Sequence, residues 1–180
     1  MDEQSQCDLE CVMEADSGPR FENTEQGYRL VQEQFIPQPR PVVWEFFAAA
    51  ENLQRITPSF LGFQILTPSP IEMHAGTLIE YRISLFGLPM KWRTEILEFE
   101  PPEHFIDLQL KGPYALWHHS HRFEECEGGT LMTDQVDYRP PMGVLGGLAN
   151  TLFVQRTLAR IFRHRMQQVN LLFGINEQQS

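Results

Sequence analysis

Two histidines that alternate along one segment are the side chains of this sequence best suited to chemistry. His119 and His121 stand two positions apart within 114–125, and Asp134 follows within 130–138. Side chains two positions apart on a β-strand share a face, so both imidazoles should point the same way. A carboxylate opposite an imidazole fixes its tautomer and prepares it to transfer a proton. His121 and Asp134 are therefore the candidate catalytic pair.

The two segments should pair as a β-hairpin that places Asp134 opposite His121. With Glu127 and Gly128 at the centre of a two-residue turn, one face carries the pairs Trp117 with Tyr138, His119 with Val136, His121 with Asp134 and Phe123 with Met132. This face is apolar except for its histidines and its aspartate, whereas the opposite face is charged and polar, as a solvated surface should be. A slip of one residue would bury that charged set, so the sequence predicts this register.

The pair admits several roles, and the sequence leaves them open. A buried polar group without a partner costs about 1–3 kcal/mol, so Asp134 can face His121 for stability alone. The same two side chains can also contact the polar part of a ligand or move a proton. His119 is more open as a ligand contact, because its expected opposite residue is Val136.

His119 and His121 also match, with Asp107 or Asp134, the two-histidine, one-carboxylate set of non-haem iron sites. That set needs an open facial geometry, which spacing along the chain does not supply. Serines and cysteines of the sequence lack the setting of a catalytic nucleophile. We therefore expect no metal and no cofactor.

Neighbouring strands should add aromatic and polar groups to the same site. Tyr81 and Trp92 lie in alternating segments whose inward faces can line a pocket. Asp107 lies within 104–111, and which face of that strand lines the pocket stays open. The candidate ligand-binding residues are Tyr81, Trp92, Asp107, Trp117, His119, His121, Asp134, Val136 and Tyr138.

Periodicity and turn residues predict a single α+β domain around this site. An alternating strand over 28–36 precedes two short helices, the first entered at Pro41 and the second stopped at Pro58. Six further strands, separated by Pro/Gly-rich turns, follow over 60–67, 77–86, 90–99, 104–111, 114–125 and 130–138. Such short connections imply an antiparallel meander. The segment 143–173 has no proline and repeats apolar residues at helical spacing, so one long helix should cover a curved, seven-stranded sheet.

Positive charge on this last helix is concentrated in one stretch. The set is Arg156, Arg160, Arg163, His164 and Arg165. Arginines suit the C-terminal half of a helix and lay their stems over apolar surface, so a solvated face is the plain interpretation. The alternative is a contact with an acidic partner or a lipid head group.

Composition is that of one domain with a substantial core. The chain has 180 residues, of which 42% are hydrophobic, and a net charge of -10, which disfavours nucleic acid and anionic membranes as partners. The sequence contains no run of about twenty apolar residues that could span a bilayer, and its acidic start differs from a signal peptide. We therefore expect a cytoplasmic protein without stable membrane insertion.

Residues 1–27 should form a flexible acidic leader, 28–175 the folded domain and 176–180 a tail. Cys7 and Cys11 lack neighbours that would complete a zinc site.

Five motifs along the chain carry a family resemblance. They are Glu80-Tyr81-Arg82-Ile83, Trp92-Arg93-Thr94-Glu95-Ile96, Phe105-Ile106-Asp107, Gly112-Pro113-Tyr114 and the Trp-x-His-x-His strand that begins at Trp117. With the order of elements over 28–173, they resemble the START-like (SRPBCC) superfamily, which includes Bet v 1-type, polyketide cyclase/dehydrase-like and coenzyme Q-binding proteins. The resemblance implies a helix-grip fold, in which the sheet wraps the long helix and leaves a cavity for an apolar or amphipathic molecule.

Three functional hypotheses follow. The favoured one is binding or carriage of a hydrophobic or amphipathic small molecule, such as a lipid, an isoprenoid quinone or a polyketide, whose head group meets His119, His121 and Asp134. The alternative is a cyclase/dehydratase-type enzyme that moves a proton through His121 and Asp134 without a metal. The third is a protein-interaction module with a filled core and no cavity. Ligand identity and oligomeric state stay open.

Overall fold

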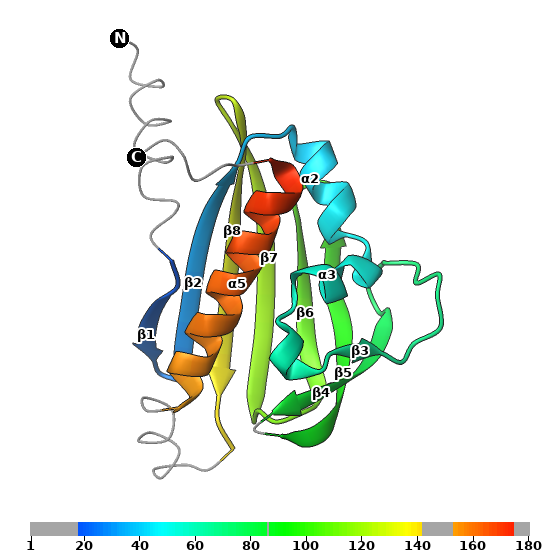
Figure 1. Cartoon of the computed structure of the whole chain (residues 1–180), viewed down its shortest axis with the longest axis vertical. Coiled ribbons are helices and arrows are strands. Elements are labelled where there is room, and N and C mark those ends of the chain that lie inside the picture. Colours follow the sequence, from blue (N-terminus) through cyan, green and yellow to red (C-terminus); the bar gives the residue numbers. More distant parts are fainter. Residues whose placement is uncertain (1–17, 86, 142–152, 175–180) are drawn as a thin grey trace.

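An antiparallel sheet with one long helix across it forms the body of the protein (Figure 1). The structure is a computed structural model, and it describes residues 18–85, 87–141 and 153–174. The elements in chain order are β1 (Arg20–Thr24), β2 (Gly27–Ile36), α2 (Arg40–Phe47), the 3-10 helix η1 (Ala50–Asn52), α3 (Leu53–Ile56), the 3-10 helix η2 (Ser59–Leu61), β3 (Gln64–Ile65), β4 (Leu78–Leu85), β5 (Leu88–Glu100), β6 (His104–Lys111), β7 (Leu116–Cys126), β8 (Gly129–Arg139) and α5 (Gln155–Phe173).

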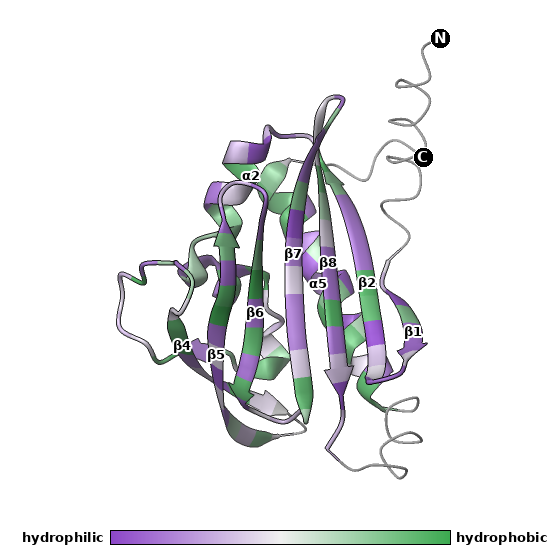
Figure 2. Cartoon of the chain, turned by 180° about the vertical axis from the view of Figure 1, so that it is seen from behind, coloured by the Kyte–Doolittle hydropathy of each residue, from purple (hydrophilic) through white to green (hydrophobic). Residues whose placement is uncertain are grey.

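The strand order follows the chain with one exception. Within the described residues the order is β1-β2-β8-β7-β6-β5-β4-β3, and every neighbouring pair is antiparallel. The exception is β2, which pairs with β8 and so joins the first hairpin to the end of the meander. The helices α2, α3 and α5 lie on one face of the sheet, and the opposite face is open (Figures 1 and 2). This arrangement confirms the predicted helix-grip fold.

The β7–β8 hairpin has the predicted register. His121 is paired with Asp134 and His119 with Val136, and the strands meet at Cys126 and Gly129 around the two-residue turn. Gly128 lies in this turn with φ +80°, a left-handed conformation that glycine adopts without steric cost. The register predicted from the unequal polarity of the two hairpin faces is therefore confirmed.

Helix α5 is attached to the sheet by one apolar stripe and by two glutamines of β2. The buried residues along the helix are Leu158, Ala159, Phe162, Arg165 and Val169. From the sheet, Gln32 donates to the Phe162 carbonyl at 3.4 Å, and Gln34 donates to the Met166 carbonyl at 3.0 Å. Among the described residues, no helix is long and apolar enough to cross a membrane.

Two hydrophobic clusters fill the space between the helices and the sheet. One includes Trp117 and Phe162, and the other includes Phe105 and Val169. The two histidines lie where the clusters meet, because the His121 ring stacks on Phe105 at 4.1 Å between centroids and the His119 ring contacts the edge of Trp117 at 6.2 Å. A polar site is thus built into the apolar interior.

Two predictions of secondary structure are wrong. Arg20–Thr24 was expected to belong to an unstructured leader but forms edge strand β1, which makes eight strands rather than seven. Its pairing with β2 rests on backbone hydrogen bonds, and Phe21 is its main apolar contact, so hydrophobic periodicity does not reveal it. The strand expected over 60–67 is reduced to Gln64–Ile65, because η2 occupies Ser59–Leu61 and is followed by Gly62 with φ +50°. The predicted residues 1–17, 143–152 and 176–180 lie outside the described chain.

Candidate functional site

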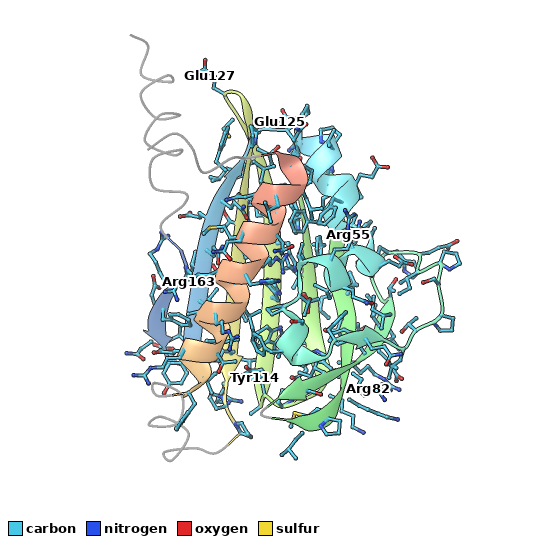
Figure 3. All side chains as sticks on the ribbon, in the orientation of Figure 1. Arg55, Arg82, Tyr114, Glu125, Glu127 and Arg163 are labelled. Carbon is cyan, nitrogen blue, oxygen red and sulfur yellow. The ribbon has the colours of Figure 1, made fainter. Side chains whose placement is uncertain are left out.

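A cavity of about 200 Å³ lies between the sheet and the helices. Most of its wall is aromatic or aliphatic, and its lining residues include Phe47, Ala49, Leu53, Ile56, Leu61, Phe63, Ile79, Tyr81, Ile83, Trp92, Ile96, Phe105, Tyr114, Trp117, Leu158 and Phe162. Most of these residues come from α2, α3, strands β4 to β7 and α5, and the others come from η2 and from connecting segments. Figure 3 shows that side chains lie between α5 and the sheet. The predicted cavity under the long helix is present.

Four polar side chains gather on one part of this wall. Asp107, His119, His121 and Arg165 line the cavity, and Asp134 lies next to them without lining it. They come from three adjacent strands, β6, β7 and β8, and from α5. We call these five residues the polar cluster. It is the one charged group in the otherwise apolar lining that the structure describes.

Sheet pairing places the two aspartates on either side of the two histidines. Asp107 is directly opposite His119, and Asp134 is directly opposite His121. Each carboxylate also reaches the other ring diagonally, since residues offset by two positions on paired strands remain neighbours. The register of three strands, not one hairpin alone, therefore assembles the site.

Every ring nitrogen of the two histidines faces a carboxylate. His119 Nδ1 lies 3.5 Å and His121 Nε2 lies 3.3 Å from Asp107 Oδ2. The remaining nitrogens face Asp134 Oδ1, with His119 Nε2 at 3.3 Å and His121 Nδ1 at 2.7 Å. The Thr94 hydroxyl is 3.2 Å from Asp107 Oδ1 and can donate to it or to the Leu108 carbonyl at 3.3 Å. Both carboxylates are thereby held by several partners.

Arg165 supplies the only guanidinium of the polar cluster. Its Nε lies 3.3 Å from Asp134 Oδ2, at ion-pair distance, and its terminal nitrogen lies 3.3 Å from His121 Nδ1. The prediction of a solvated face is wrong for Arg165, which is only 9% exposed. Its spacing was the available signal: it follows Phe162 by three positions and precedes Val169 by four, on the apolar stripe.

Charge and burial compete within the polar cluster. Burial alone would raise the pKa of Asp134, but the charges of Arg165 and His121 and the hydrogen bonds from the histidines hold that pKa well below its usual value. Burial is also the largest single influence on Asp107 and would raise its pKa, but the hydrogen bonds from His121 and Thr94 and the charges of the two imidazoles together lower that pKa. Burial and the neighbouring His121 lower the pKa of His119 to about 4 despite its carboxylate partners. At neutral pH the site therefore holds two carboxylates and a neutral His119.

The structure divides the predicted ligand-binding residues into two groups. Those that line the cavity are Tyr81, Trp92, Asp107, Trp117, His119 and His121. Asp134 is buried beside the histidines, and Val136 and Tyr138 are fully buried in the core outside the lining. The candidate catalytic atoms, His121 Nδ1 and Asp134 Oδ1, are 2.7 Å apart. The inward face of β6, left open by the sequence, carries Phe105 and Asp107.

Comparison with protein families gives a match over most of the chain. Residues 36–167 match the sequence model of a family described as polyketide cyclase/dehydrase and lipid transport. This range runs from the end of β2 into α5 and includes all five residues of the polar cluster. A search of curated proteins finds no match.

Solved structures share the fold at low sequence identity. Protein Ms6760 from Mycobacterium smegmatis is 14% identical, with a TM-score of 0.63 over 86% of this chain and 96% of that chain. A protein from Arthrobacter aurescens is 12% identical, with a TM-score of 0.63 over 83% of this chain and 87% of that chain. At these identities, the likeness shows the fold alone.

One larger protein contains a similar part. The nucleoside-diphosphate sugar epimerase from Corynebacterium glutamicum is 27% identical, with a TM-score of 0.56 over 77% of this chain. The match covers only 28% of the epimerase chain, so most of that protein has no counterpart here.

Proposed function

Because the chain belongs to the polyketide cyclase/dehydrase and lipid transport family, we propose that it binds a hydrophobic or amphipathic small molecule in the cavity beneath α5. Membership agrees with the START-like resemblance of the sequence and with the helix-grip fold. The observation that carries the proposal is an apolar cavity with a single polar cluster on its wall.

The cavity is too large to be a packing defect of an ordinary core. A void of 200 Å³ would cost about 5 kcal/mol if it stayed unfilled, at about 24 cal/mol per Å³. That cost is comparable with the whole stability of a small domain. An apolar ligand would offset it by replacing the missing contacts, and aromatic side chains such as Trp92 and Trp117 would contact the ligand body. A filled core, which the protein-interaction hypothesis requires, does not describe this interior.

The polar cluster favours an uncharged, oxygen-bearing head group. Its two carboxylates outnumber its one guanidinium, so a fatty-acid carboxylate would add a third negative charge to a buried site. The carbonyl and hydroxyl oxygens of a quinone or a polyketide add no charge to the site, and they can accept hydrogen bonds from His119, His121 or Arg165. An isoprenoid quinone or a polyketide is therefore the proposed ligand class.

The first experiment is native mass spectrometry of the freshly purified protein, followed by organic extraction and identification of the released molecule. We expect one lipid-like molecule per chain. The chelator-treated protein is then titrated with a short-chain ubiquinone and with a fatty acid, and the fluorescence of the cavity tryptophans reports binding. Tighter binding of the fatty acid would contradict the head-group argument, and binding of neither probe by ligand-free protein would contradict the proposal.

A matched pair of variants locates the binding. Ala49 lines the cavity, whereas Ala115 is exposed at the approach to β7, and both can be changed to Phe. Ala49→Phe fills part of the cavity and should weaken quinone binding at least tenfold. Ala115→Phe adds the same side chain outside the cavity and should leave the affinity unchanged. Equal affinities for the two variants would show that the ligand binds elsewhere.

A second candidate function rests on the contact between His121 and Asp134. Their 2.7 Å separation beside an apolar cavity suits a general acid/base, as a cyclase or dehydratase requires. His121→Ala should then bind the extracted ligand but no longer convert it, and the loss of conversion would appear as unchanged ligand after incubation. Equal conversion by His121→Ala and wild type would exclude His121 as the acid/base, and no conversion by wild type would leave binding as the function.

A further inference from the structure

We propose that Asp107, His119 and His121 bind a divalent first-row transition metal ion on the wall of the cavity. The proposal goes beyond ligand binding and does not depend on it, because the donor atoms belong to the protein alone. The side chains each offer one donor atom, and the three atoms lie within 4.8 Å of one another. The nitrogen and oxygen donors suit Zn²⁺, Fe²⁺ or Co²⁺ better than Mg²⁺ or Ca²⁺.

The separations of Asp107 from the two histidine donor atoms match those of a coordination sphere. Asp107 Oδ2 lies 3.3 Å from His121 Nε2 and 3.5 Å from His119 Nδ1. Ligands about 2.1 Å from a tetrahedral ion are about 3.4 Å from each other, so both separations already fit. All three donor atoms lie within 4.8 Å of one another, so side-chain movement can bring them around one ion.

The opposite nitrogens of both rings have the partner that metal-bound histidines usually have. Asp134 Oδ1 lies 3.3 Å from His119 Nε2 and 2.7 Å from His121 Nδ1, so one carboxylate can accept from both rings. Such a carboxylate fixes the tautomer that turns the other nitrogen's lone pair toward a metal. Arg165 holds Asp134 from the far side, and Thr94 can hold the free oxygen of Asp107. Ligands and supporting groups are therefore both in place.

Charge balance also favours a cation at Asp107. The guanidinium of Arg165 forms its ion pair with Asp134. Among the residues that the structure describes, the ion pairs of Asp107 are with the two imidazoles alone. The side chain of Asp107 is only 14% exposed, and a buried carboxylate is costly without a cationic partner. A divalent ion bound at Oδ2 would supply it.

The three protein ligands leave coordination positions that face the cavity. Asp107, His119 and His121 all line it, whereas Asp134 lies beside them outside the lining. Sites with three protein ligands typically bind water or substrate in the remaining positions. An oxygen of a cavity ligand can therefore complete the coordination of the ion.

The test is titration of the full-length, chelator-treated protein with Co²⁺, followed by its visible absorption spectrum. We expect the d–d bands of a nitrogen/oxygen site, a stoichiometry of one ion per chain by elemental analysis after gel filtration, and displacement by Zn²⁺. Asp107→Asn and His119→Gln keep the size of the side chains and should weaken Co²⁺ binding at least 100-fold. Asp134→Asn removes the supporting carboxylate and should weaken it about 10- to 100-fold.

A matched control separates this site from binding by other histidines or cysteines. His118 lies on the same strand but on the outer face, so His118→Ala should keep the full Co²⁺ spectrum. All variants retain the three cysteines, so any ion bound there persists in them. Wild-type protein that binds no Co²⁺, or Asp107→Asn and His119→Gln variants with the wild-type spectrum, would overturn the proposal. Since the quinone titration is performed in chelator, failure of this test leaves the proposed ligand binding untouched.

Discussion

The two faces of the sheet use the same residue types for opposite purposes. On the outer face, Arg29 of β2 contacts Asp137 of β8 with a 2.7 Å ion pair whose side chains are 36% and 24% exposed. On the inner face, three positions earlier on β8, Asp134 contacts His121 and Arg165 with a side chain that is 6% exposed. Water screens the outer pair, whereas the inner charges depend on one another. We therefore expect the same arginine–aspartate chemistry to contribute little to stability on the outer face and much more on the inner face.

Removing Arg165 should produce the largest difference between the faces. Arg165→Met keeps much of the apolar stem but leaves Asp134 buried without its cation, and breaking a buried pair in this way costs about 3–5 kcal/mol. Equilibrium urea unfolding of metal-free protein measures this loss. Arg163→Met changes an arginine that is exposed and lies on the β1 side of α5 in Figure 3, and it should change the stability by less than about 0.5 kcal/mol. Similar losses in both variants would contradict the inner-face assignment.

The pH dependence of stability should come from the inner face as well. Because the pKa of His119 falls from 6.5 in the unfolded chain to about 4 in the fold, the unfolded state binds more protons between these values. Stability therefore rises with pH over this window, by about 3 kcal/mol at 1.36 kcal/mol per pKa unit, and is fully present above pH 6.5. The lowered pKa values of Asp107 and Asp134 affect stability at lower pH. Their contribution is lost as the pH falls below the ordinary carboxyl pKa of 3.8.

Two histidine variants isolate this effect in metal-free protein. His119→Gln removes the buried imidazole, so its free energy of unfolding should vary less between pH 4 and 6.5 than that of wild type. His118→Ala removes the outward neighbour on the same strand and should keep the wild-type slope. If His118→Ala flattened the curve and His119→Gln did not, the titrating group would be on the outer face.

Sequence reasoning predicted the β7–β8 half of the polar cluster because that hairpin has faces of unequal polarity. The register that opposes His121 and Asp134 follows from a two-residue turn and needs no distant information. Asp107 belongs to β6, and β6 joins β5 through shifts in register at Arg93/Thr94 and at Ile96/Glu98. Such irregularities are not visible in residue periodicity, so the inward face of β6 could not be predicted.

Arg165 and the cavity could not be predicted for different reasons. The arginine repeats the spacing of Phe162 and Val169, but its charge argued for solvent until the position of Asp134 beneath the helix was known. The volume of the cavity depends on how side chains from α2, α3 and α5 pack against the sheet. A local sequence pattern does not predict this packing. Local polarity thus predicted strands and pairs, whereas the contents of the interior required the packed structure.

A neutral inner-face contact should have an intermediate effect. Gln34 donates to the Met166 carbonyl at 3.0 Å and to the Asn170 side chain at 2.6 Å, so Gln34→Leu removes both bonds between β2 and α5. Because no charge is left unpaired, we expect a loss of about 1 kcal/mol in the free energy of unfolding. Gln135→Leu makes the same change on the outer face, where it should cost less than about 0.5 kcal/mol. Urea unfolding of the two variants, side by side, decides whether burial or charge sets the difference between the faces.

The smallest effect is expected at the outer ion pair itself. Arg29 makes two hydrogen bonds to Asp137, at 2.7 and 2.9 Å, and this geometry is better than that of the contacts made by Arg165. If geometry decided stability, Arg29→Met would be the more damaging change. Exposed pairs contribute only about 0–1 kcal/mol, so we expect a loss near the middle of that range that shrinks further in high salt. A loss at Arg29 equal to that at Arg165, measured in the same urea series, would show that the two faces do not differ and that burial does not govern these contacts.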